Sequence, residues 1–383
     1  MSDQVADPPL REGTQAPAAV TAAPAAPARV ARLRDLHPGW MASVMGTAIL
    51  AVVADANPGN LGALQGLGHG IGVVLALVAY ALGGVLLVAY ALRWLRHRQA
   101  ALADLRHPVL GGLHATLPGG LLVLAVMTNA IGPRLMPEAA VTVLAALLAS
   151  VGALLALVVG VAFGYVLFVG EVAGPSVNGG WFIPPVVAVI VPMAFTPLMA
   201  HVGTGTARLL LFLGYAFLGL GFVLFLLVLG LLHDRLVLHP VPPALLAPSL
   251  WIALGPIGVS VLAPISLAHA AQGAVGAAGP ALMTVSRLVG TALWGFGFWW
   301  LAIVVALLLR YVRTGPIPFH LGWWAFVFPL GAYTMATVTL ARLWELPAVD
   351  GLAAVLFLGL AAAWVTVALR TAGAVRSARI WLR

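Results

Sequence analysis

The sequence predicts an all-α polytopic membrane protein with ten transmembrane helices arranged as five helical hairpins. Of its 383 residues, 8% are charged and 62% are apolar, and the mean hydropathy is +1.07. Soluble domains carry about 25% charged residues, which their water-exposed surface requires. The second observation is a series of apolar runs close to the roughly 20 residues that cross a bilayer as a helix. A water-soluble globular protein is therefore excluded.

Ten apolar runs separate the chain into predicted spans and flanking segments. The predicted spans are 39–54, 71–92, 113–130, 139–169, 185–201, 209–232, 250–268, 290–312, 321–343 and 352–372. Residues 1–35 are rich in Ala and Pro and contain no apolar core segment, so we expect a disordered cytoplasmic tail. Residues 36–372 form the predicted ten-helix domain, and 373–383 a short basic cytoplasmic tail.

The distribution of arginine predicts the orientation. All 19 basic residues are Arg, and none is Lys. If the amino terminus is inside, 15 arginines lie in inside segments and four lie outside. Cytoplasmic loops are enriched in basic residues, so both termini are predicted to be cytoplasmic. The outside arginines are Arg134, Arg208, Arg287 and Arg342.

Proline separates the odd-numbered spans from the even-numbered spans. The predicted even spans contain no proline, whereas four of the five odd spans contain one or more, and the first odd span has Gly46 instead. Proline removes a backbone donor, and interrupted helices in a membrane need protein or water around them. We therefore expect the odd helices to lie inside, around a central pore, and the even helices to face lipid. Kinks are expected at Pro118, Pro192, Pro256 and Pro264.

Two features of this pattern leave alternatives open. The prolines are also compatible with a packed bundle that has no pore. The four outside arginines each follow an odd span and would form a positive ring at the outer mouth, which would concentrate anions. Alternatively, each is paired with a neighbour, as Arg342 could be with Glu345 three residues later.

The predicted spans carry little chemistry that would support catalysis or cation coupling. No Asp, Glu or Arg lies in mid-span, there is no cysteine, and no hydrolase, metalloprotease or phosphate-loop motif occurs. We expect no enzyme activity, no catalytic residue, no metal, no cofactor and no nucleic-acid partner. Small hydroxyl side chains in the odd spans are candidate pore-lining groups, although each could instead bond to its own helix. These are Ser43, Thr47, Thr196, Ser260, Thr334 and Thr337.

Four segments resemble one membrane-protein family. They are HPGWMASVMGTAIL at 37–50, WFIPPVVAVIVP at 181–192, PSLWIALGPIGVSVLA at 248–263 and WWAFVFPLGAYTMAT at 323–337. Together they are similar to the tellurite-resistance/dicarboxylate transporter family, over about residues 36 to 372. This family includes plant slow anion channels, a bacterial tellurite-resistance protein, fungal malate permeases and sulfite exporters.

The resemblance implies a particular gate and assembly. In the family's channels, a phenylalanine directly before a proline in the ninth helix plugs the pore, and the matching residues here are Phe328 and Pro329. The resemblance also implies a homotrimer with one pore in each subunit. Plant channels have a polar residue before this phenylalanine and long phosphorylated tails. This chain has Val327 and a short tail, so kinase gating is not supported.

The combined prediction is a multi-pass protein that moves small anions across a bacterial cytoplasmic membrane. The substrates in view are sulfite, a C4-dicarboxylate such as malate, and chloride or nitrate, with the choice between channel and carrier left open. One alternative is a membrane-embedded haem protein that uses span-end histidines such as His201 and His269. Another is a structural subunit without any pathway.

Overall fold

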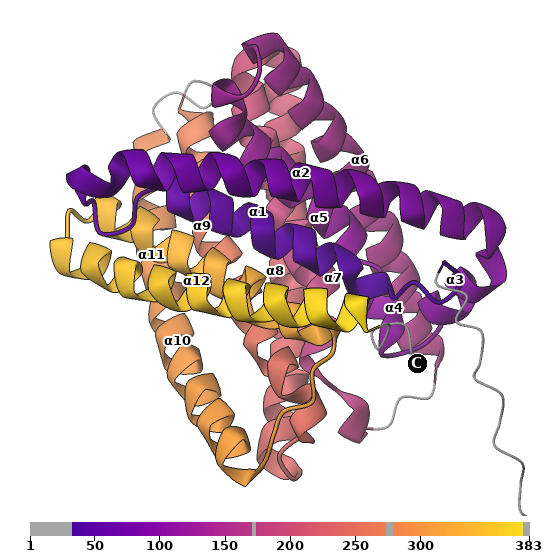
Figure 1. The fold of residues 1–383 in the computed structure, drawn as a ribbon. Helices are drawn as coiled ribbons and strands as arrows, with labels where there is room; N and C mark the ends of the chain where they lie inside the picture. The colour runs from indigo at the N-terminus through magenta and orange to yellow at the C-terminus, as the bar shows by residue number, and fades with distance from the viewer. Residues whose placement is uncertain (1–32, 171–173, 273–278, 378–383) are drawn as a thin grey trace, which may run out of the picture.

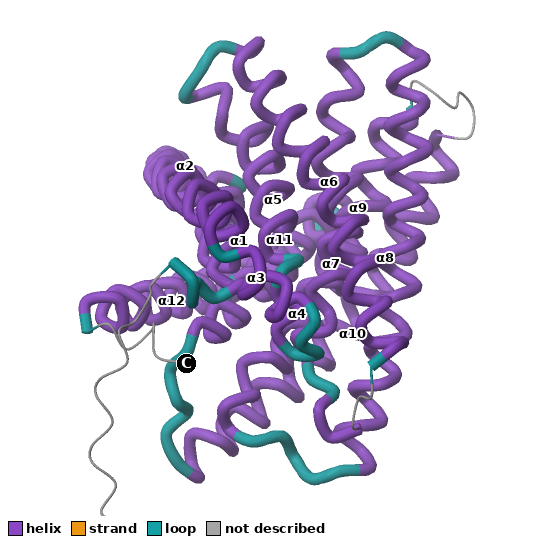
Figure 2. Tube along the Cα trace, turned by 90° about the vertical axis from the view of Figure 1, so that its right-hand side faces the viewer, coloured by secondary structure: helices purple, strands orange, loops and turns teal. Residues whose placement is uncertain are grey.

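The computed structural model describes residues 33–170, 174–272 and 279–377. The two predicted tails lie outside these residues, except for 33–35, which form a turn, and 373–377, most of which continue the last helix. All regular elements in the described residues are helical (Figure 2). The described residues contain ten helical spans that are long and apolar enough to cross a membrane, which confirms the prediction of ten.

Each span is built from one or more helical segments. The α-helices are α1 (Met41–Asp55), α2 (Gln65–Arg96), α3 (Arg98–Leu105), α4 (Leu110–Leu113), α5 (Thr116–Ile131), α6 (Glu138–Val169), α7 (Ile183–Phe195), α8 (Thr204–Leu238), α9 (Leu254–Ala271), α10 (Gly279–Thr314), α11 (Phe328–Leu343) and α12 (Pro347–Arg376). Short 3₁₀ segments precede four of the inner α-helices: η1 (Pro38–Trp40), η5 (Gly179–Phe182), η7 (Ala244–Ala253) and η9 (Leu321–Phe326). Span 3 begins instead with the one-turn helix α4.

The ten spans form two layers. The apolar windows of the odd spans are 72–89% buried, and those of the even spans are only 17–33% buried. The even helices expose large apolar side chains such as Phe168 and Leu95, which would be unfavourable in water and are favourable in lipid. The predicted inner and outer layers are therefore confirmed.

The five inner helices form a closed ring. Contacts join α1 to α5, α5 to α7, α7 to α9, α9 to α11, and α11 back to α1. Each inner helix also packs against the even helix that follows it, so each hairpin contributes one inner and one outer helix. In Figure 1 the C-terminal end of α12 lies at the end of the bundle where α1 begins.

Four of the five inner spans begin earlier than predicted, and the ninth begins at Leu321 as predicted. Prolines lie near the starts of the inner α-helices. Pro118 and Pro256 are each the third residue of an α-helix, α5 and α9, where the backbone N–H has no intrahelical partner to lose. Pro192 and Pro264 lie inside α7 and α9. The first span also contains a proline, because the structure extends it back to Pro38.

Candidate functional site

A cavity of about 340 Å³ lies at the end where the five inner spans begin. We call this cavity the vestibule. Every inner helix contributes to its wall through residues in its first turns. These residues are Ala42 and Met45 of α1, Thr116 of α5, Ile183 and Val186 of α7, Gly255 of α9, and Phe328 and Pro329 of α11. The rest of the wall comes from the preceding segments, so the vestibule is a product of the closed ring.

Three residues of the vestibule wall cap the helical segments in the same way. The Nδ1 atoms of His37 and His320 accept hydrogen bonds from the backbone N–H groups two residues later, at 3.0 and 3.1 Å. The side-chain oxygen of Asn178 accepts the equivalent bond from Gly180 at 2.8 Å. These side chains satisfy N–H groups that a helix start leaves without partners.

A short motif accompanies these caps. The first, fifth and ninth spans begin with HPGW at 37–40, NGGW at 178–181 and HLGW at 320–323. Glycine is needed at the third position, because a Cβ on Gly322 would overlap the His320 ring and a Cβ on Gly180 would lie 2.8 Å from the Asn178 oxygen. This repeat was the sequence signal for the vestibule wall, and sequence analysis did not identify it.

The other polar groups of the vestibule are also bonded to the backbone. The Thr116 hydroxyl donates to the Pro38 carbonyl at 2.8 Å, and the Ser249 hydroxyl donates to the Leu246 carbonyl at 2.7 Å. His320 Nε2 lies 2.8 Å from the Leu245 carbonyl oxygen. Burial lowers the pKa of His320, so the ring is neutral at pH 7. Among the described residues, no Asp, Glu or Arg lines the vestibule.

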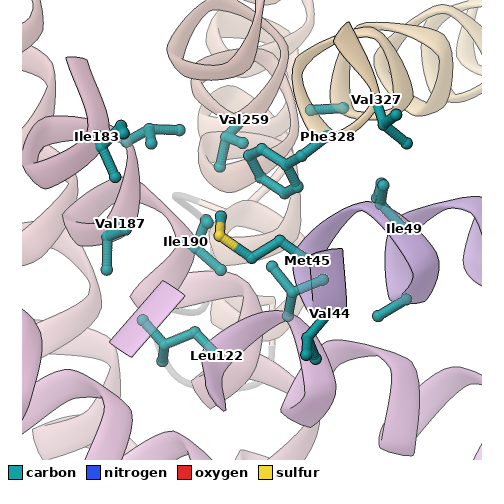
Figure 3. Packing of buried hydrophobic residues seen from close by; sticks show 14 of the residues in the cluster. Val44, Met45, Ile49, Leu122, Ile183, Val187, Ile190, Val259, Val327 and Phe328 are labelled. Carbon is teal, nitrogen blue, oxygen red and sulfur yellow. The ribbon is translucent and has the colours of Figure 1, made fainter. Parts of the chain in front are cut away.

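Phe328 is one of the aromatic residues that line the vestibule. It is the first residue of α11, and its side chain is buried although it lines the cavity. Figure 3 shows its ring directed at the side chains of Met45 and Val259, from two other inner helices. Gly255 of the neighbouring α9 lies beside the ring, where an added Cβ would be 3.6 Å from it. Buried aliphatic residues such as Ile49 and Ile190 belong to the same hydrophobic cluster as Phe328, inside the ring of inner helices.

The predicted pore-lining hydroxyls lie elsewhere in the inner layer. None of the six is among the described residues that line the vestibule. The hydroxyls of Ser43, Thr47, Thr334 and Thr337 donate to carbonyls of their own spans at 2.7–2.8 Å. Thr196 bonds to Ser266 at 2.5 Å. The buried Ser260 hydroxyl has no hydrogen-bond partner among the described residues.

Two of these threonines connect the two layers. The indole N–H of Trp364 in α12 donates to Thr47 at 3.0 Å, and that of Trp294 in α10 donates to Thr337 at 2.9 Å. Both hydroxyls are therefore directed at outer helices in this conformation. The proposal that any of the six contacts an anion stays a prediction.

Three of the four outside arginines have partners at the other end of the bundle, which we call the far end. Arg134 is paired with Asp55 at 2.7 Å. Arg287 stacks over Trp344, with 4.3 Å between its Cζ atom and the ring centre. Arg342 donates to the backbone carbonyls of Ala56 and Asn57, and not to Glu345. These contacts offset the positive charges or engage the guanidinium groups. A ring of positive charge formed by the four arginines therefore stays a prediction.

The haem-protein alternative depends on the span-end histidines. His201 lies 3.9 Å from the carboxylate of Glu138, an exposed pair. No group of three or more metal-ligating side chains occurs among the described residues. The described residues therefore bring together a largely apolar vestibule whose wall includes Phe328.

A closed ring of five helices shielded by an outer layer, with a cavity lined by the first turns of all five, is typical of polytopic membrane proteins of the transporter and channel class. The sequence profile described as the voltage-dependent anion channel matches residues 35–372. The chain belongs to this family, which confirms the resemblance seen in the four segments. The family consists of membrane transporters and channels rather than enzymes.

The relatives agree with this assignment. An uncharacterized transporter of Methanocaldococcus jannaschii is 29% identical over 91% of this chain and 96% of its own length. A sulfite efflux pump of Trichophyton rubrum is 25% identical over 88% and 89%. A malic acid transport protein of Schizosaccharomyces pombe is 28% identical over 34% of this chain and 31% of its own length. The family and these relatives support anion transport by this membrane protein.

Proposed function

We propose that this protein passes small anions through the ring of inner helices, and that Phe328 is the gate. The observation that carries the proposal is the vestibule, to which every inner helix contributes and whose wall includes the ring of Phe328. A phenylalanine ring is an effective barrier because it offers an ion no hydrogen bond in place of its lost hydration shell.

The surroundings of Phe328 allow the ring to move. It is the first residue of α11, and Val327 alone separates it from η9, so a rotation of its side chain disturbs no preceding α-helical turn. Its neighbour Met45 has a flexible, unbranched side chain that adapts to a displaced ring. Gly255 leaves space beside the ring on the neighbouring helix α9, since it has no side chain. These features support gating by a side-chain movement without a large rearrangement of helices.

The vestibule favours anions of low charge. It offers no fixed positive charge, and its polar side chains are already bonded to the backbone. The remaining attraction comes from five helix starts, whose dipoles point their positive ends at the cavity. The cost of removing an ion from water rises with the square of its charge. We therefore propose that chloride, nitrate and hydrogen sulfite pass more readily than the malate dianion.

Orientation and assembly complete the proposal. The excess of arginine in inside segments, 15 against four, favours cytoplasmic termini and a vestibule that opens to the cytoplasm. The setting is a bacterial cytoplasmic membrane. The family resemblance favours a homotrimer in which each subunit has its own path.

The test is anion efflux from proteoliposomes that contain the wild type, Phe328→Ala or Phe326→Ala. Phe326 is a matched control because it is also buried, lies two residues away and does not line the vestibule. Its ring packs edge-on against Trp251, with 5.3 Å between the ring centres. We expect Phe328→Ala to raise chloride and sulfite efflux at least about tenfold, which corresponds to a barrier lower by about 1.4 kcal/mol. Phe326→Ala should leave efflux near the wild-type level.

Other outcomes separate the alternatives. A flux of one anion that falls in Phe328→Ala would place Phe328 in the binding site of a carrier. Equal fluxes in all three proteins would exclude Phe328 as the gate. No flux of chloride, sulfite or malate in any of them would contradict a transport path.

A further inference from the structure

A second hollow lies on the outer surface of the bundle, between α3 and α6. It has a volume of about 580 Å³ and lies at the same end as the vestibule, since α3 connects the second span to the third. We call it the α3–α6 groove. One wall consists of Leu102, Leu105 and Arg106, and the other of Leu157, Val158, Val161, Ala162, Tyr165 and Val166.

The α6 wall is a continuous apolar strip. Its residues recur every three to four positions, which places them on one face of the helix. From 157 to 166 this face is about 13 Å long at 1.5 Å per residue. Val158 is 54% exposed and Val161 is 64% exposed, so this face is open to the surroundings of the protein. The shape and chemistry match part of an extended hydrocarbon chain.

The α3 wall is held in a fixed position by a buried ion pair. The Arg93 guanidinium lies 2.5 Å from the Asp104 carboxylate, and both side chains are buried. Arg93 also donates from Nε to the Arg34 carbonyl at 3.0 Å. This arrangement keeps α3 against the end of α2 and directs Leu102 and Leu105 at the groove. A short amphipathic helix in this position is suited to the headgroup region of a membrane.

Arg106 gives the groove a positive end. Its side chain is exposed, and it forms no ion pair or side-chain hydrogen bond with any other described residue. The nearest acid in sequence, Asp104, is already paired with Arg93. Tyr165 is 67% exposed and also lines the groove, where its hydroxyl can donate a hydrogen bond. An apolar strip that ends at a cation and a phenol is complementary to an anionic amphiphile.

We propose that the α3–α6 groove binds one anionic phospholipid, with an acyl chain along α6 and its phosphate group at Arg106. A zwitterionic lipid would fill the same strip, but its headgroup brings a second, positive charge close to Arg106. The preference for an anionic headgroup therefore comes from Arg106, and the retention of the acyl chain from the α6 strip. The proposal does not depend on the identity of the gate or the transported anion.

The test measures lipid binding to the purified full-length protein in detergent. Dioleoyl phosphatidylglycerol and dioleoyl phosphatidylcholine are added separately, and bound lipids are counted by native mass spectrometry alongside the melting temperature. We expect phosphatidylglycerol to raise the melting temperature of the wild type by about 3 °C more than phosphatidylcholine does. Arg106→Gln should abolish this difference. Arg313→Gln is the control, because Arg313 is also exposed at this end but lies on α10.

A second variant tests the acyl-chain strip. Val161→Trp would fill the groove from an exposed position, so the fold should tolerate it. We expect it to lower the number of retained lipids of both kinds while Arg106 is still present. A phosphatidylglycerol preference that persists in Arg106→Gln would overturn the proposal. A change of oligomeric mass in Val161→Trp would assign the groove to a second copy of the chain instead.

Discussion

At the scale of single residues, the vestibule shows how one hydrogen-bond requirement is met by two side-chain types. His37, Asn178 and His320 each accept a backbone N–H bond at the start of a helical segment. Asparagine does this at any pH through its amide oxygen, whereas histidine does it only while Nδ1 carries no proton. The histidine caps therefore make the vestibule wall sensitive to acid.

The His320 cap predicts a defined pH dependence of stability. Burial lowers the pKa of His320 below its ordinary value of 6.5, so the unfolded chain binds more protons than the folded chain at mildly acidic pH. The contribution of the cap is therefore complete above about pH 6.5 and decreases as the pH falls toward the folded pKa. We expect His320→Asn to match the wild type at pH 7.5 and to lose less stability than the wild type at pH 5.5. His320→Ala should be destabilised at both, by about 1 kcal/mol at pH 7.5.

Melting temperatures of the three proteins between pH 5.5 and 8 would check this prediction. The comparison with His320→Asn removes the contribution of the other nine histidines, since all of them are present in both proteins. An identical acid loss in the wild type and His320→Asn would show that His320 does not titrate with folding.

At the scale of helices, polar contacts join each layer to the other. Trp364 bonds to Thr47, Trp294 bonds to Thr337, and the hydroxyls of Tyr80 and Thr128 lie 2.7 Å apart. In each case an aromatic residue on an outer helix meets a threonine on an inner helix. In hydrocarbon there is little hydrophobic force between helices, so such bonds and close packing determine how the layers fit together.

The Trp364–Thr47 contact predicts a measurable coupling between α12 and α1. A double-mutant cycle with Trp364→Phe and Thr47→Val should give a coupling energy of about 0.6 kcal/mol, because hydrogen bonds between membrane helices have this average value. The measurement is unfolding in detergent or bicelles. Trp344→Phe combined with Thr47→Val is the control, since Trp344 bonds to Thr291 and should show no coupling. Equal coupling in both cycles would indicate a general effect of removing tryptophan.

At the scale of the whole molecule, the last residue of α1 and the loop that follows connect three of the five hairpins at the far end. Asp55 is paired with Arg134 from the second hairpin at 2.7 Å. Arg342, from the fifth hairpin, donates to the carbonyl of Ala56, and Asp350 accepts from the Gly59 N–H at 3.2 Å. These contacts join three hairpins at the far end, and the Asp55 carboxylate offsets the charge of Arg134.

Release of Arg134 should increase the access of anions from the far end. We expect Asp55→Asn, in a Phe328→Ala background, to raise the initial chloride flux about twofold at low salt, because an unpaired arginine attracts anions. The increase should disappear at about 1 M salt, where the Debye length is about 3 Å. Asp350→Asn is the control, since it removes the same charge without releasing an arginine. Equal effects of the two variants would show that Arg134 has no specific role.

The sequence by itself determined the number of spans and their division into two layers. Hydrocarbon permits few structures, so the long apolar runs could only be helices. The prolines of the odd spans marked the inner layer, because interrupted backbone needs protein around it. The same pattern did not show that Pro118 and Pro256 lie in the first turns of α5 and α9. The α4 turn and the η7 segment, which precede these two helices, could not be recognised from it.

Tertiary structure alone decided which side chains meet. Thr47 and Thr337 were predicted to face a pore, but a helix turns about 100° per residue, and only packing shows that their hydroxyls meet Trp364 and Trp294. The pairing of Arg134 with Asp55 joins two hairpins and has no signal in local spacing. The vestibule likewise exists only because five helix starts, far apart in the chain, converge when the ring closes.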